Sequence, residues 1–121
     1  MKKFAVIVAA GLLAFAATGN AAVKVIGQGE TKTFDPSDFS PAMKANYKVM
    51  KAKCVRCHSM ERVVEAITTG VSPISGQPFD KAAVKAYSAK MMRKTNSKMT
   101  RQEIMATEQL MNYLLDKVAA R

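Results

Sequence analysis

Cys54-Val55-Arg56-Cys57-His58 is the stretch of sequence that decides what this chain folds around. Two thiols separated by two residues, with an imidazole directly after the second, form the C-x-x-C-H attachment signature of a c-type haem. Each thiol can add to one vinyl group of the porphyrin, and the imidazole then binds the iron as the proximal ligand. The pattern occurs once, so it predicts one haem c bound covalently to Cys54 and Cys57, with His58 on its iron.

Three other kinds of site use the same residue types. A thioredoxin-like redox pair needs the strands of a βαβ unit nearby, whereas the sequence around this motif is helical and rich in lysine. A structural zinc site needs four ligands, and the chain has two cysteines and one histidine. A plain disulfide between Cys54 and Cys57 is the third alternative, but it does not explain why His58 follows.

Residues 1–21 are typical of a secretory signal peptide. Lys2 and Lys3 precede an apolar run from Phe4 to Ala17, and small residues follow at Gly19-Asn20-Ala21-Ala22. The run is shorter than the roughly 20 apolar residues of a membrane span. We therefore expect cleavage after Ala21 or Ala22, a periplasmic location, and no membrane span in the mature protein. Haem attachment outside the cytoplasm agrees with export.

The mature chain is strongly basic. Without Lys2 and Lys3 it keeps 17 basic and 9 acidic residues, a net charge of +8 before any haem propionates. Such an excess favours acidic partners, so we expect redox proteins with acidic docking surfaces. Nucleic acid is excluded for an exported chain without a basic recognition motif. The candidate docking cations are Lys44, Lys48, Lys51, Lys53, Lys90, Arg93, Lys94 and Lys98.

The mature length, about 100 residues, is enough for one small domain, which we expect to be monomeric. Residues 22–40 are predicted to form an extended lead-in, with a short strand possible at 23–26. A helix is predicted from Ser40-Pro41, with serine as the N-cap and proline in the first turn. Its apolar residues recur at steps of three and four and share one face: Met43, Tyr47, Met50 and Cys54.

Three further helices are predicted after the motif, which makes the fold all-α with four to five helices. One spans 60–69 and ends at Gly70, one begins at Asp80 and runs to Lys94, and a loop over 71–79 joins them. The last helix starts with the capping box of Thr100 and Glu103. We expect its apolar face to pack against the helix before the motif. That face comprises Ile104, Thr107, Met111, Leu114 and Val118, with Leu110 and Leu115 beside them.

Together these residues resemble a monohaem class I cytochrome c, from the helix before Cys54 to Tyr113-Leu114. The resemblance implies a cytochrome c domain over 41–121, in which the first and last helices pair over the haem. It also implies an electron-transfer protein rather than an enzyme. The chain departs from the family pattern at Met50, where an aromatic residue is common, and at Asn46, where glycine is common.

The second axial ligand has to come from another residue type, because His58 is the only histidine. Methionine, lysine, water or an empty position remain, and thioether sulfur suits haem iron. The resemblance favours Met92, seven residues before Met99 and ahead of the last helix. Met91 and Met99 are the alternatives.

The resemblance also implies two weaker assignments around the haem. The backbone carbonyl of Pro73 would accept the second N–H of the proximal imidazole, unless Pro73 only interrupts a loop. The hydroxyl of Tyr87 would bind a propionate, unless its ring only packs in the core.

These predictions describe a periplasmic one-electron carrier between redox partners, with His/Met-ligated haem iron. The alternative is a five-coordinate haem c sensor or peroxidase-like protein with an open distal site. A third possibility is a cytochrome subunit that relays electrons only within a larger complex.

Overall fold

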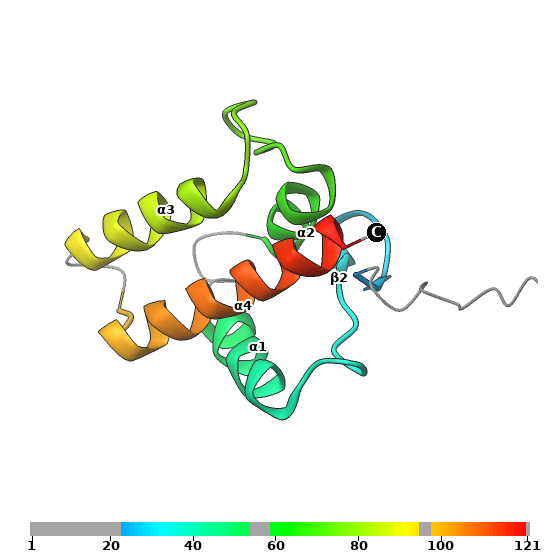
Figure 1. Ribbon diagram of the computed structural model, residues 1–121, viewed down its shortest axis with the longest axis horizontal. Helices are drawn as coiled ribbons and strands as arrows, with labels where there is room; N and C mark the ends of the chain where they lie inside the picture. Colours follow the sequence, from blue (N-terminus) through cyan, green and yellow to red (C-terminus); the bar gives the residue numbers. More distant parts are fainter. Residues whose placement is uncertain (1–22, 54–58, 95–97, 121) are drawn as a thin grey trace, which may run out of the picture.

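The computed structural model describes residues 23–53, 59–94 and 98–120 (Figure 1). The four α-helices of this part of the chain are α1 (Pro41–Lys53), α2 (Met60–Thr69), α3 (Lys81–Arg93) and α4 (Arg101–Ala119). Two strands, β1 (Val25–Ile26) and β2 (Thr33–Phe34), pair antiparallel on either side of the 3-10 helix η2 (Gly29–Thr31). The mainly helical architecture predicted from the sequence is confirmed, and both strands lie before α1.

The helices begin and end close to the predicted capping residues. The side chain of Asp80 accepts a hydrogen bond from the Ala83 amide at 2.9 Å and starts α3. Thr100 and Glu103 form both bonds of the capping box that starts α4, at 3.1 and 2.8 Å. Gly70 ends α2 with φ of 73°, a left-handed conformation that favours glycine. Only the end of α3 differs, at Arg93 instead of Lys94.

Helix α4 is the central element of the domain. It contacts α1, α2 and α3, and Figure 1 shows α3 on one side of α4 and α1 on the other. The face of α4 that was predicted to be apolar is the face that packs, and its buried members are Ile104, Thr107, Leu110, Met111 and Leu114. Tyr47 and Met50 are the buried residues of α1. The predicted packing of the first helix against the last is therefore confirmed. None of the described helices is long and apolar enough to span a bilayer.

The segment before α1 folds onto the helices. Phe34 and Phe39 are buried in the main core, and Phe39 makes edge-to-face contacts with Tyr47 and Tyr113 at centroid distances of 5.8 and 5.7 Å. The hydroxyl of Tyr47 accepts from the Phe34 amide at 3.1 Å and donates to the Phe34 carbonyl at 3.0 Å. An extended lead-in was predicted over 22–40, and its described part, 23–40, contributes aromatic side chains to the core.

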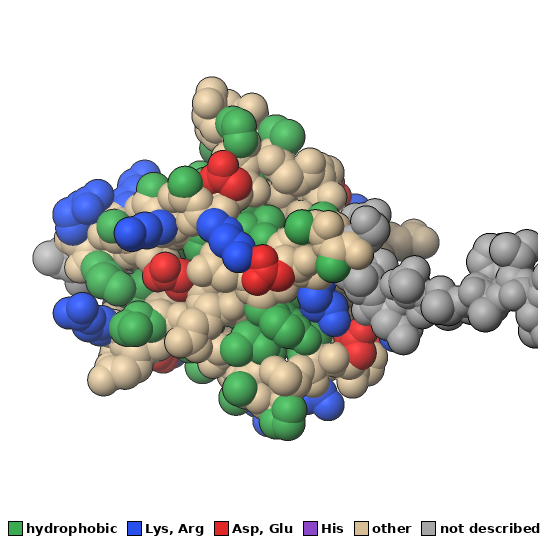
Figure 2. Space-filling model, in the orientation of Figure 1, with side chains coloured by type: hydrophobic (Ala, Val, Ile, Leu, Met, Phe, Trp, Pro, Cys, Tyr) green, Lys and Arg blue, Asp and Glu red, His purple; other side chains and the backbone are tan. Residues whose placement is uncertain are grey.

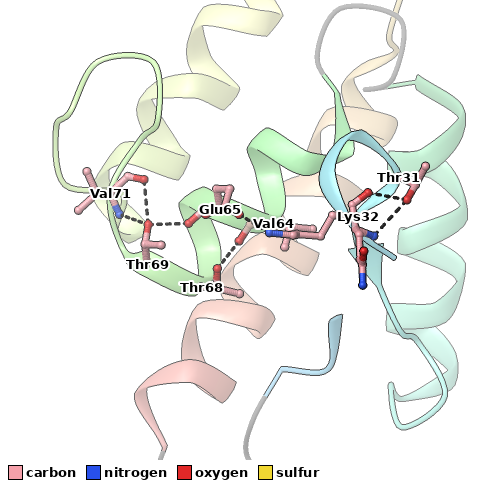
Figure 3. A network of polar contacts seen from close by, with 8 residues as sticks. Thr31, Lys32, Val64, Glu65, Thr68, Thr69 and Val71 are labelled. Atoms are coloured by element: carbon pink, nitrogen blue, oxygen red, sulfur yellow. Dashed lines mark hydrogen bonds and ion pairs between the residues drawn. The ribbon is translucent and has the colours of Figure 1, made fainter. Parts of the chain in front are cut away.

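A second connection joins this segment to α2 (Figure 3). Lys32 Nζ lies 2.6 Å from Glu65 Oε1, and both side chains are about one-third exposed. This hydrogen bond raises the pKa of Lys32 above its ordinary value. In the same network, the hydroxyls of Thr68 and Thr69 donate to the carbonyls of Val64 and Glu65, one turn back in α2. Both η2 and β2 contact α2, so the N-terminal segment packs against one side of that helix.

Candidate functional site

The predicted haem-attaching residues Cys54, Cys57 and His58 lie outside the described residues. The chain on each side of them is described. Helix α1 ends at Lys53, one residue before Cys54, and α2 begins at Met60, whose side chain is buried against the core. The segment 54–58 therefore connects two helices that both contact α4.

Glu103 ties the end of α1 to the start of α4. One of its oxygens, Oε1, accepts from the Thr100 amide at 2.8 Å, and the other, Oε2, lies 3.3 Å from Lys53 Nζ. The pKa of Glu103 lies below its ordinary value, first because the Thr100 amide donates to the carboxylate and then because Lys53 is beside it. The residue that caps α4 thus also fixes the point where the chain enters segment 54–58.

An apolar cavity of about 150 Å³ lies between α2, the loop 71–79, α3 and α4. Its walls include residues from all four elements: Arg62, Val63, Ala66, Ser72, Pro73, Ile74, Phe79, Tyr87, Lys90, Met91, Lys94 and Met111. The side chains of Val63 and Ala66 come from the first two turns of α2, directly after segment 54–58. The cavity is therefore lined by the helix that follows the C-x-x-C-H motif.

The predicted loop over 71–79 is confirmed and is compactly folded. The Phe79 amide donates to the Gly70 carbonyl at 2.8 Å, and the Ser72 amide donates to the Gln77 carbonyl at 2.9 Å. These bonds close the base of the loop and direct Pro73 and Ile74 to the cavity wall. The rings of Phe79 and Tyr87 lie 5.9 Å apart at the same wall.

The three candidate methionines lie in different surroundings. Met91 is partly buried and lines the cavity, whereas Met92 is 43% exposed and is absent from the cavity wall. Consecutive residues of an α-helix point about 100° apart, so only one of this pair can face the cavity. Met99 is partly buried before α4 and is likewise absent from the wall. Pro73 and Tyr87, which the resemblance assigned to the haem surroundings, both line the cavity.

Basic side chains border this apolar cavity. Arg62, Lys90 and Lys94 are among its lining residues. None of the described residues that line this cavity is acidic. A second cavity, of about 330 Å³, shares Lys90, Tyr87 and Phe79 with the first. Apolar walls with a cationic edge suit a flat apolar ligand that carries carboxylates. Sequence reasoning missed Arg62, although its position four residues after His58, at the start of a helix, was a usable signal.

The described walls are compatible with a haem but form only part of a site for one. A cavity of about 150 Å³ is smaller than the roughly 300–1,000 Å³ of pockets for drug-sized ligands. The described residues would therefore supply only part of such a site. Comparison of the chain with protein-family models, curated proteins and solved structures found no match.

Proposed function

We propose that this chain is an exported, periplasmic c-type cytochrome that carries one electron at a time between protein partners. The sequence Cys54-Val55-Arg56-Cys57-His58 is the single observation that carries the proposal. The apolar cavity lined by α2, directly downstream, supports it, as does the cationic edge of that cavity. A bound haem supplies reversible one-electron exchange at its iron.

The chain's residues divide the work of binding and orientation. Cys54 and Cys57 would attach the group covalently, and His58 would bind its iron. The walls from α2, the loop 71–79 and α3 exclude water from one side, while Arg62 and Lys90 offer charge to carboxylates at the edge. Electron transfer between proteins needs no separate pocket for a small-molecule substrate.

Met91 is our first choice for the distal ligand, ahead of Met92. The family resemblance favoured Met92. However, the side chain of Met92 is more exposed and is absent from the cavity wall, whereas Met91 lines that wall. A thioether on the iron favours the reduced state and raises the potential. Met99 is the third choice, because it is partly buried close to the start of α4.

The haem assignment is tested by expressing the full chain with its signal sequence and a c-type haem maturation system. We expect a red protein that retains its haem after denaturation. Its mass should exceed that of the mature polypeptide by the mass of one haem. The variant Cys54→Ala/Cys57→Ala should be exported without covalent haem. A colourless wild-type protein made under these conditions would remove the proposal.

The ligand assignment is tested with Met91→Ala, Met92→Ala and Met99→Ala. We expect Met91→Ala alone to abolish the thioether–iron charge-transfer band of the ferric protein, to lower the potential and to admit carbon monoxide rapidly. Loss of the band in Met92→Ala alone would restore the ligand favoured by the resemblance. Rapid carbon monoxide binding by the wild-type ferrous protein would instead favour the sensor or peroxidase-like alternative, because no thioether would then occupy the distal position.

A further inference from the structure

The α3–α4 hairpin carries an unbroken excess of positive charge. From Lys81 to Gln102 the sequence contains seven basic residues and no acidic residue. The basic residues are Lys81, Lys85, Lys90, Arg93, Lys94, Lys98 and Arg101. Helices α3 and α4 run antiparallel, and at one end Lys81 pairs with Asp116 at 2.6 Å.

The opposite end of the hairpin gathers most of these charges. Figure 2 shows Lys and Arg side chains clustered where α3 ends and α4 begins, with hydrophobic side chains between them. We call this surface the basic end, defined by Lys90, Arg93, Lys94, Lys98 and Arg101. Acidic residue Glu103 is close in sequence, but both its oxygens are engaged, one with the Thr100 amide and one with Lys53.

Two methionines are unusually exposed at the basic end. Met92, in the last turn of α3, is 43% exposed, and Met105, in the first turns of α4, is 45% exposed. Protein interfaces are enriched in methionine and arginine, and methionine adapts its shape to different partners. The basic end thus combines exposed apolar contact area with an excess of positive charge.

The lysines of α1 are arranged differently. Lys53 pairs with Glu103, and Lys51 lies 5.5 Å from the centroid of the Tyr47 ring. Lys44 and Lys48 are exposed on a helix whose own exposed surface shows no large apolar side chain. The candidate docking cations of α1 and those of the basic end therefore lie in distinct surroundings.

We infer that the basic end of the α3–α4 hairpin is the docking surface for an acidic protein partner. Carboxylates of the partner meet Arg93, Lys98 and Arg101, and Met92 and Met105 form the apolar centre of the contact. Lys90 also lines the cavity beside Met91, so a partner docked here lies against the cavity wall. That the partner is a redox protein rests on the proposed function, whereas the docking itself does not.

The experiment titrates the isotope-labelled full protein, as purified, with an acidic flavodoxin at low ionic strength. Backbone chemical shifts map the contact, and calorimetry gives the Kd. The variant Arg93→Gln/Arg101→Gln removes two charges from the basic end. Lys44→Gln/Lys48→Gln removes two from α1 and is the control of equal net charge. Met105→Gln probes the apolar centre, and melting curves check that every variant is folded.

We expect shifts at the end of α3 and the start of α4. Affinity should fall about fivefold or more in Arg93→Gln/Arg101→Gln, less than about twofold in the control, and steeply with added salt. Equal losses in the two double variants would overturn the inference. So would shifts centred on α1, or tight binding to phosphatidylglycerol vesicles with no binding to flavodoxin. The covalent haem is measured separately by mass, so failure of docking and failure of the proposed function are distinguishable.

Discussion

Glu103 is the residue that connects the start of α4 with the chain entering the C-x-x-C-H motif. Its carboxylate completes the capping box and pairs with Lys53, which directly precedes Cys54. Both contacts favour the ionised carboxylate, which is why its pKa is lowered from the ordinary value of 4.5. A group whose pKa is lower in the folded than in the unfolded chain stabilises the fold above its unfolded pKa.

Glu103→Gln tests this contribution through its pH dependence. Glutamine can still accept the Thr100 amide, but it carries no charge for Lys53. We expect the variant to be less stable than wild type near neutral pH. The difference should shrink as the pH falls below about 4.5 and through the lowered pKa of Glu103. Urea unfolding between neutral pH and about pH 3 measures it, with Glu108→Gln on the same helix as control. A difference that stayed constant over this range would contradict the argument.

Among the helices and strands, those of the N-terminal segment were the hardest to predict from the sequence. The helices were predictable because their caps and apolar faces are local patterns, as with Asp80 at α3 and Thr100 at α4. Strands of two residues have no measurable periodicity, and the Tyr47–Phe34 bonds join residues 13 positions apart. Nothing in the local sequence around Tyr47 indicates that its hydroxyl has a backbone partner in β2. The hydrogen bond from Lys32 to Glu65 of α2 is equally non-local.

The turn between β1 and η2 allows a specific test of this segment. Gly27 has φ of 82°, and a Cβ there would press on the backbone carbonyl of Thr31. Gly29 has φ of 55°, but the space around its Cβ position is open. We expect Gly29→Ala to cost about 1–2 kcal/mol from backbone strain, and Gly27→Ala to cost about 1–3 kcal/mol more because of the clash. Thermal or urea unfolding measures both, and equal losses would show that the tight turn does not form.

The fold and the site of this domain differ in how far the sequence could predict them. The pairing of α1 with α4 follows from two apolar faces, whose buried residues include Tyr47, Met50 and Leu110. The orientation of Met91 and Met92 did not follow, because neighbouring residues of a helix differ only in the direction in which they point. That direction is set by how α3 docks on α4, and it decides which methionine reaches the cavity.

The same cavity makes the stability of the whole domain depend on what fills it. A small domain buries a limited core, and here the apolar residues Val63, Phe79 and Met111 line an open cavity. A covalently bound haem that covers these residues would remove apolar surface from water and add dispersion contacts, so it should stabilise the helices around it. The effect should reach α2, the loop 71–79 and α3 first, since they form most of the wall.

We therefore expect Cys54→Ala/Cys57→Ala, exported without haem, to melt about 10 °C or more below the haem-bearing protein. A loss of about 2 kcal/mol shifts the Tm of a domain of this size by roughly that amount. Hydrogen exchange should be fastest in α2 and α3, while α1 and the part of α4 that packs on it remain protected. Wild-type chain produced without haem maturation, with its thiols reduced, is the control, because it separates loss of haem from loss of the cysteines. If both haem-free forms melted within about 2 °C of the haem-bearing protein, the helices would be stable without any ligand, and the cavity would not be the place where a haem contributes to the core.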